Sequence, residues 1–161
     1  MSTLKMESIG QVVVNQDMYR LVLKPEYRAA LATLECIPHI QVLWWFNHCD
    51  NSRSRNVLTV DTPYLHAPNI VGIFATRSPE RPNPIALTCC QITYVDIEKG
   101  EVGLSYIDAE NGSPLLDIKP YMPSFDRLEH IGKQPDWFSN WPDSIEKSRD
   151  FDWARVFNFE N

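Results

Sequence analysis

The sequence predicts a mainly β protein that folds as an antiparallel β-barrel or a curled sheet. Six or seven short apolar runs are separated by turn-forming residues, and only one segment near the N-terminus has clear helical spacing. Short strands in this number, with so little helix, are typical of antiparallel barrels and curled sheets. No G-x-G-x-x-G follows any of these runs, which argues against the doubly wound nucleotide-binding fold.

The first part of the chain contains three predicted strands and the helix. Residues 9–14 and 18–23 are short apolar runs suited to strands. Apolar residues then recur at helical spacing between positions 27 and 34, and Pro25 suits a first helical turn, so we expect a short amphipathic helix. Residues 40–46 are apolar at nearly every position. This pattern predicts a strand covered on both faces, one by the core and one by a helix or a partner subunit.

The remaining strands are predicted further along the chain. Residues 57–60 form a brief strand, and residues 70–76 are a further apolar β-type run. A long strand over residues 85–97 returns over residues 102–107 through a turn that contains glycine. Residues 115–119 form the last strand, which the following proline ends.

A stiff polar loop over residues 77–84 is the main candidate for a binding site. Its three prolines fix φ and restrict the residues before them, so we expect an extended loop without a helix. The loop presents Arg77, Ser78, Arg81 and Asn83 on a backbone with little freedom. Two guanidinium groups on an ordered loop suit a carboxylate or a phosphate. The alternative is a turn whose arginines pair with carboxylates on the protein surface.

Length and composition predict one soluble cytoplasmic domain. A chain of 161 residues is long enough to bury a substantial core. The net charge of -6 argues against nonspecific binding of nucleic acid, although a local basic patch is compatible with it. We see no signal peptide and no apolar stretch long enough to cross a bilayer. The four cysteines lack zinc-ligand spacing, so we expect reduced thiols and no metal site.

Two longer motifs resemble one known family. Residues 74–88, F-A-T-R-S-P-E-R-P-N-P-I-A-L-T, are similar to the signature of the TsaA-like family. Residues 108–121, D-A-E-N-G-S-P-L-L-D-I-K-P-Y, resemble its D-x-x-D-G-T-P-x-L-D-I-K-P-Y block, with a tight turn expected at Asn111-Gly112. The family, also called tRNA methyltransferase O, comprises S-adenosylmethionine-dependent methyltransferases that act on tRNA N6-threonylcarbamoyladenosine. The resemblance spans about residues 7–129.

The resemblance implies a fold, a reaction and partners. It implies a single-sheeted β-barrel domain over residues 1–129, which assembles as a homodimer with its pocket near the subunit boundary. It also implies S-adenosylmethionine as cofactor and tRNA as substrate, with N-methylation of the modified adenosine next to the anticodon. Residues 130–161 would then be an aromatic-rich C-terminal extension with short helices, which packs on the barrel or on the partner subunit.

The resemblance also implies the site residues. Arg77 suits the carboxylate of the donor or a substrate phosphate, and Leu87 would cover the adenine. Arg81, with Asn83, would hold the threonyl carboxylate of the substrate. The complete set of implied cofactor contacts is His48, Cys49, Arg77, Leu87, Ala109, Glu110, Asn111 and Gly112.

Three residues of the second block are candidates for assisting proton loss from the acceptor nitrogen. This nitrogen is amide-like and a poor nucleophile, so a base or hydrogen-bond acceptor beside it would help. Asp117 and Lys119 are two residues apart in a predicted strand, so they share a face. Tyr121 is a further candidate of this kind. An ordinary structural ion pair explains the Asp117–Lys119 spacing equally well.

Departures from the family pattern leave other functions open. The Pro-Arg-Gln element that family members carry after the first strand is absent, and N-G-S-P replaces D-G-T-P. The chain is also too short for the additional C-terminal domain of longer members. A methyltransferase with a different small-molecule or RNA acceptor is therefore one alternative, and a non-catalytic S-adenosylmethionine-binding module is another. A purely structural or interaction protein would be supported only by the apolar strand at 40–46 and by the three tryptophans in the tail.

Overall fold

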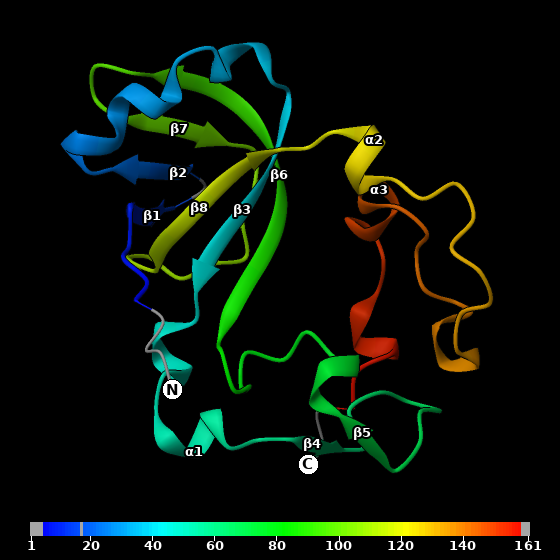
Figure 1. Ribbon diagram of the computed structural model, residues 1–161. Helices are drawn as coiled ribbons and strands as arrows, with labels where there is room; N and C mark the ends of the chain where they lie inside the picture. The colour runs from blue at the N-terminus through cyan, green and yellow to red at the C-terminus, as the bar shows by residue number, and fades with distance from the viewer. Residues whose placement is uncertain (1–4, 17, 159–161) are drawn as a thin grey trace.

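The computed structural model describes residues 5–16 and 18–158 and contains a closed antiparallel barrel (Figure 1). Its strands follow the order β1-β2-β7-β6-β3-β8, and β1 pairs with β8 to close it. The prediction of a mainly β barrel is confirmed. The barrel strands are β1 (Gly10–Asn15), β2 (Met18–Leu23), β3 (His39–Trp45), β6 (Ile85–Asp96), β7 (Glu101–Leu104) and β8 (Pro114–Pro120).

A second, smaller sheet lies outside the barrel. It consists of β4 (Thr59–Asp61) and β5 (Ile70–Gly72), which pair only with each other (Figure 1). The helical segments are all short: η1 (Pro25–Leu31), η2 (Leu34–Cys36), η3 (Asn47–Cys49), α1 (Ser52–Arg55), η4 (Ile73–Ala75), α2 (Pro123–Asp126), η5 (Asp136–Phe138), α3 (Ile145–Ser148) and η6 (Trp153–Arg155). Within the described residues, no helix has the length and apolar character that a membrane span requires.

The hydrophobic core fills the barrel interior. Alternate residues of β3 point inward, and Ile40, Val42 and Trp44 are 0–2 % exposed, whereas the residues between them are only half-buried. Within one chain the second face of β3 is therefore only half-covered, and the expected cover by a partner subunit stays a prediction. Leu21 and Val102, from neighbouring strands, are completely buried in the same core.

The expected amphipathic helix is replaced by two 3-10 segments. Pro25 begins η1, as its fixed φ allows. Thr33, however, has a φ of 68°, which separates η1 from η2 and prevents a continuous α-helix. Leu31 is nevertheless buried against the barrel core, as the apolar spacing predicts.

The proline-rich loop contains no helix, as predicted, but it bends at several residues instead of running extended, and it does not connect two paired strands. No helix occurs over residues 77–84. Of the apolar run at 70–76, only the first three residues form a strand, because the chain turns through η4 immediately after β5. β5 pairs with β4, whereas β6 pairs with β3 and β7. The loop therefore carries the chain from the small sheet into the barrel.

Candidate functional site

A cleft of about 140 Å³ opens where the proline-rich loop enters the barrel. β3 ends and β6 begins at this point, and their register pairs Trp45 with Ile85. The loop after β3 and the loop before β6 therefore meet at the same edge of the barrel. We call this hollow the arginine cleft. It is lined by Phe46, Arg77, Arg81, Ile85, Ala86, Leu87, Thr88 and Asp108.

The two arginines of the cleft are free to bind an anion. Arg77 approaches only the Leu87 carbonyl, at 3.5 Å from its Nη1. Arg81 donates weakly to carbonyl oxygens of its own loop, with Thr76 at 3.4 Å. Across residues 5–16 and 18–158, neither guanidinium has a carboxylate within ion-pair distance. The alternative in which surface carboxylates occupy both arginines is therefore not observed.

A carboxylate that the sequence interpretation missed also lines the cleft. Asp108 accepts a hydrogen bond from Thr88 Oγ1 at 2.8 Å, and Thr88 Oγ1 in turn accepts from Trp44 Nε1 at 3.1 Å. These two hydrogen bonds fix the side chain of Asp108 in the cleft that the two arginines also line. The sequence did contain a signal for Asp108, because it is the first residue of the second motif and its partner Thr88 is the last residue of the first motif.

The second motif reaches the same edge through a polar side-chain contact. His48 Nε2 lies 2.9 Å from Glu110 Oε2, so the loop after β3 contacts the block that resembles the family. Gly112 has a φ of 84°, as the expected Asn-Gly turn requires. Asn111 Oδ1 accepts from the Val14 backbone N–H at 3.0 Å, so this side chain holds the turn against β1. Ala109 is 9 % exposed beside them.

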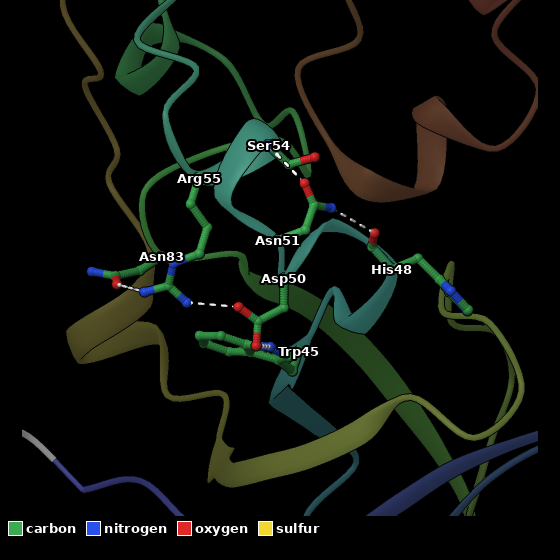
Figure 2. Close-up of polar contacts among 7 residues, drawn as sticks. All are labelled: Trp45, His48, Asp50, Asn51, Ser54, Arg55 and Asn83. Atoms are coloured by element: carbon green, nitrogen blue, oxygen red, sulfur yellow. Dashed lines mark hydrogen bonds and ion pairs between the residues drawn. The ribbon is translucent and has the colours of Figure 1, made fainter.

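A polar network orders the loop that carries His48 (Figure 2). Asp50 accepts from Trp45 Nε1 at 3.1 Å and from Arg55 Nη1 at 2.8 Å. Arg55 also reaches the amide oxygen of Asn83 at 3.4 Å, and its guanidinium lies over the Trp45 ring at 5.9 Å. Asn83, a predicted substrate contact, is therefore joined to the loop after β3.

A capping interaction and a second cross-loop bond complete this support. Asn51 caps α1 by accepting from the Ser54 N–H at 3.0 Å, and its amide donates to the His48 carbonyl at 3.2 Å (Figure 2). Ser54, which is buried, donates to Glu80 at 3.0 Å. The loop after β3 and the proline-rich loop are thus joined at two places.

Replacing Asp50 with Asn is expected to reduce stability at neutral pH and to have no effect in acid. The hydrogen bond from Arg55, followed by that from Trp45, lowers the pKa of Asp50. The folded state therefore binds its proton less tightly than the unfolded chain, so the stabilisation is present above the ordinary Asp pKa and is lost as pH falls through the folded value. For an exposed pair we expect at most about 1 kcal/mol, or about 2–4 °C in Tm.

Thermal unfolding of both proteins across pH measures this difference. The Tm gap between wild type and the Asp50→Asn variant should close below about pH 4. A Tm difference that persists unchanged at low pH would show that the charge of the Asp50 carboxylate is not what stabilises the wild-type protein.

Cys49 faces the two carboxylates of the adjoining loops. Burial, and then the charges of Glu80 and Glu110, raise the pKa of its thiol. It is therefore a neutral thiol at physiological pH and not a nucleophile. It can contribute a contact to a bound ligand but no charge.

None of the three residues predicted to assist proton loss lines the cleft. Lys119 Nζ is 2.6 Å from Asp117 Oδ2, and this hydrogen bond raises the pKa of Lys119, so the two form a surface ion pair. The Tyr121 N–H donates to the carbonyl of His39, at the opposite end of β3 from the cleft. At about 3.3 Å per residue, this places Tyr121 roughly 20 Å away. Their catalytic role stays a prediction that this geometry does not support.

The sequence matches one family model, described as the tRNA-methyltransferase O N-terminal domain, over residues 8–127. An S-adenosyl-L-methionine-binding protein of Archaeoglobus fulgidus is 36 % identical over 111 residues, which cover 68 % of this chain and 74 % of that protein. A human tRNA (adenine(37)-N6)-methyltransferase is 37 % identical over 112 residues. That match covers 70 % of this chain but only 24 % of the human protein.

Solved structures resemble the fold over most of the chain. A crystal structure titled TrmO superimposes with a TM-score of 0.63 at 26 % sequence identity. The match covers 82 % of this chain and 64 % of that one. A TrmO structure from Pseudomonas aeruginosa gives a TM-score of 0.59 at 26 % identity, with 80 % of this chain and 60 % of that chain covered. The chain therefore spans about two thirds of these proteins.

Proposed function

The chain belongs to the family of the tRNA-methyltransferase O N-terminal domain, and from this premise we propose that it methylates tRNA with S-adenosylmethionine as donor. The proposed acceptor is the N6 nitrogen of threonylcarbamoyladenosine next to the anticodon. The observation that carries the proposal is the arginine cleft, because both family motifs contribute to it: Arg77, Arg81 and Leu87 come from the first motif and Asp108 from the second.

The residues of the cleft fit the donor chemically. The donor presents a carboxylate, a ribose and an adenine. Among the described residues Arg77 has no carboxylate partner, so it suits the donor's carboxylate. Leu87, which is 44 % exposed at the cleft, offers the adenine an apolar face. Asp108 is an acceptor for ribose hydroxyls or for the donor's ammonium group.

The size of the cleft favours a shared site. Ligand pockets usually span about 300–1,000 Å³, and the cleft offers about 140 Å³. One chain therefore encloses only part of the donor, and the rest lies over the exposed His48–Glu110 pair. We propose that a second copy of the chain covers this open side and that the protein acts as a homodimer.

The reaction needs positioning more than covalent assistance. The bound donor supplies an already activated methyl group. The protein must hold the acceptor nitrogen in line with it, and such alignment can supply much of the rate increase. Arg81, with Asn83 fixed by Arg55, holds the threonyl carboxylate. Asp108 is better placed than Asp117 to accept the proton, because only Asp108 lines the cleft.

Thermal melting with S-adenosylmethionine tests donor binding. At a concentration of about 100 times its Kd, the cofactor should stabilise the fold by roughly 2.7 kcal/mol, whereas adenosine alone should give less. An unchanged Tm at saturating cofactor would contradict the proposal and favour a structural or interaction protein.

Transfer of a labelled methyl group to total tRNA, followed by mass analysis of the nucleosides, tests the acceptor. We expect label in methylated threonylcarbamoyladenosine and a loss of this nucleoside in cells without the protein. Normal levels in such cells would overturn the assignment of the acceptor. The second candidate is a small-molecule acceptor, which the net charge of -6 favours. Protein that binds the cofactor but transfers no label to tRNA would support this candidate.

A further inference from the structure

A second, larger hollow adjoins the arginine cleft. It has a volume of about 470 Å³, and Arg77 and Arg81 line both hollows. Its remaining walls are mostly aromatic. We call it the aromatic hollow, and its lining consists of Tyr64, Phe74, Ala75, Thr76, Arg77, Arg81, Phe138 and Trp141.

One wall of the aromatic hollow comes from the C-terminal tail. Phe138 and Trp141 lie beyond residue 127, where the match to the family model ends. The tail reaches the hollow because it packs beside the small sheet: Phe157 forms a β-bridge with Tyr64, and the Leu65 N–H donates to the Val156 carbonyl at 2.9 Å. In Figure 1 the red end of the chain accordingly lies next to β4 and β5.

Ring packing fixes the orientation of Trp141. Its ring centroid lies 4.3 Å from that of Phe138, 5.1 Å from that of Tyr64 and 5.5 Å from that of Trp153. Its indole N–H is buried without a hydrogen-bond partner in the described part of the chain, so no hydrogen bond from the indole holds the ring. The wall is therefore a preformed aromatic surface.

Phe74 lines the same hollow from a separate segment of the chain. It belongs to η4, directly before the proline-rich loop, and is 79 % exposed although it is a large apolar residue. An exposed ring beside two guanidinium groups that have no carboxylate partner among the described residues is a poor arrangement for stability alone. It is a favourable arrangement for a ligand that is both planar and anionic, because rings stack on the plane while arginines hold the charge.

We propose that the aromatic hollow binds an unpaired nucleobase of the RNA substrate, with the adjoining phosphate or carboxylate held by Arg77 and Arg81. This inference rests on the proposed function and adds the place where the RNA is held. The base stacks between Phe74 and the wall of Trp141 and Phe138, and the arginines separate it from the donor in the smaller cleft. The volume of about 470 Å³ is in the range of pockets that hold one nucleotide.

Charge complementarity favours this occupant over a protein segment. The chain is acidic overall, with a net charge of -6, yet both charged residues that line the hollow are arginines. An apolar peptide would cover the two guanidinium groups without supplying an opposite charge, which is costly. A nucleotide can stack its base on the aromatic rings while its phosphate pairs with the two arginines.

The Phe74→Ala variant tests the inference, because an exposed side chain can be removed without opening the core. Its Kd for an RNA anticodon stem-loop, measured by fluorescence anisotropy at fixed salt, should rise about 5- to 100-fold, as the loss of one stacked base predicts. Its Kd for S-adenosylmethionine should not change. In a methyl-transfer assay, KM for the RNA should rise with KM for the cofactor unchanged.

The Phe125→Ala variant is the matched control. Phe125 is 84 % exposed on α2 and does not line the hollow, so its removal should leave both affinities unchanged. Stem-loop binding that is the same in wild type and in Phe74→Ala would overturn this inference alone. Wild-type protein that binds the cofactor but no stem-loop would overturn both this inference and the proposed acceptor. If Phe74→Ala weakens the binding of AMP by the same factor as that of the stem-loop, the hollow is a site for free nucleotides instead.

Discussion

Replacing Arg77 with alanine is expected to weaken both donor and RNA binding, with a fall of about 10- to 150-fold in affinity for S-adenosylmethionine. Arg77 lines both hollows and has no competing carboxylate among the described residues, so its charge is available to ligands. A hydrogen bond to a charged group contributes about 1.5–3 kcal/mol, which corresponds to this range. Isothermal titration with the cofactor measures the loss directly.

Two further variants separate charge from geometry. Arg77→Lys keeps the charge but loses the planar fork, so it should recover only part of the affinity. Arg53→Ala removes an exposed arginine of α1 that lines neither hollow, and its affinity should equal that of wild type. Equal affinities for Arg77→Ala and Arg53→Ala would show that donor binding depends on the net charge of the protein and not on the position of Arg77.

The pattern of apolar residues was sufficient to predict most barrel strands. Period-2 alternation places β2 at Met18–Leu23, as expected from its apolar run, and the long strand at 85–97 is observed as β6 (Ile85–Asp96). Strands of this kind are defined by local side-chain alternation and by turn residues at their ends. Proline likewise excludes helix from residues 77–84 through local sterics alone.

The position of the site residues around the barrel could not be predicted in the same way. Spacing indicates that Asp117 and Lys119 share a face, which is observed, but it does not indicate which end of the barrel that face approaches. Asp108 follows β7 and reaches the cleft because β7 pairs with β6, which carries its partner Thr88, and side-chain contacts of this kind are not encoded in a local pattern. The aromatic wall from the tail depends on long-range packing of the same kind.

Replacing Gly10 with alanine is expected to lower stability by about 3 kcal/mol, or roughly 10 °C in Tm. Gly10 lies in β1, where it pairs with Leu23 of β2 and with Leu115 of β8. A Cβ at this position would lie 2.2 Å from the Val22 carbonyl oxygen and 2.9 Å from the Leu23 Cα. Both are backbone atoms, so the strands must separate to make room.

Gly72→Ala is the matched control for this prediction. A Cβ at Gly72 in β5 would meet no atom within 4 Å, so its stability should stay within about 0.5 kcal/mol of wild type. Denaturant unfolding of the two variants measures the contrast, and a Gly10→Ala protein as stable as Gly72→Ala would contradict it.

The Gly10 variant also tests how the fold positions the site. β1 joins β8 through only two paired positions, and β1 holds the second motif through the Val14–Asn111 and Val12–Gly112 hydrogen bonds. Pushing β1 away from β2 should disturb these hydrogen bonds and loosen the turn that follows Glu110, while β3 and β6 stay paired. Cofactor affinity of Gly10→Ala should therefore fall even at temperatures where its barrel core is still folded. Unchanged affinity there would mean that the first motif alone binds the donor.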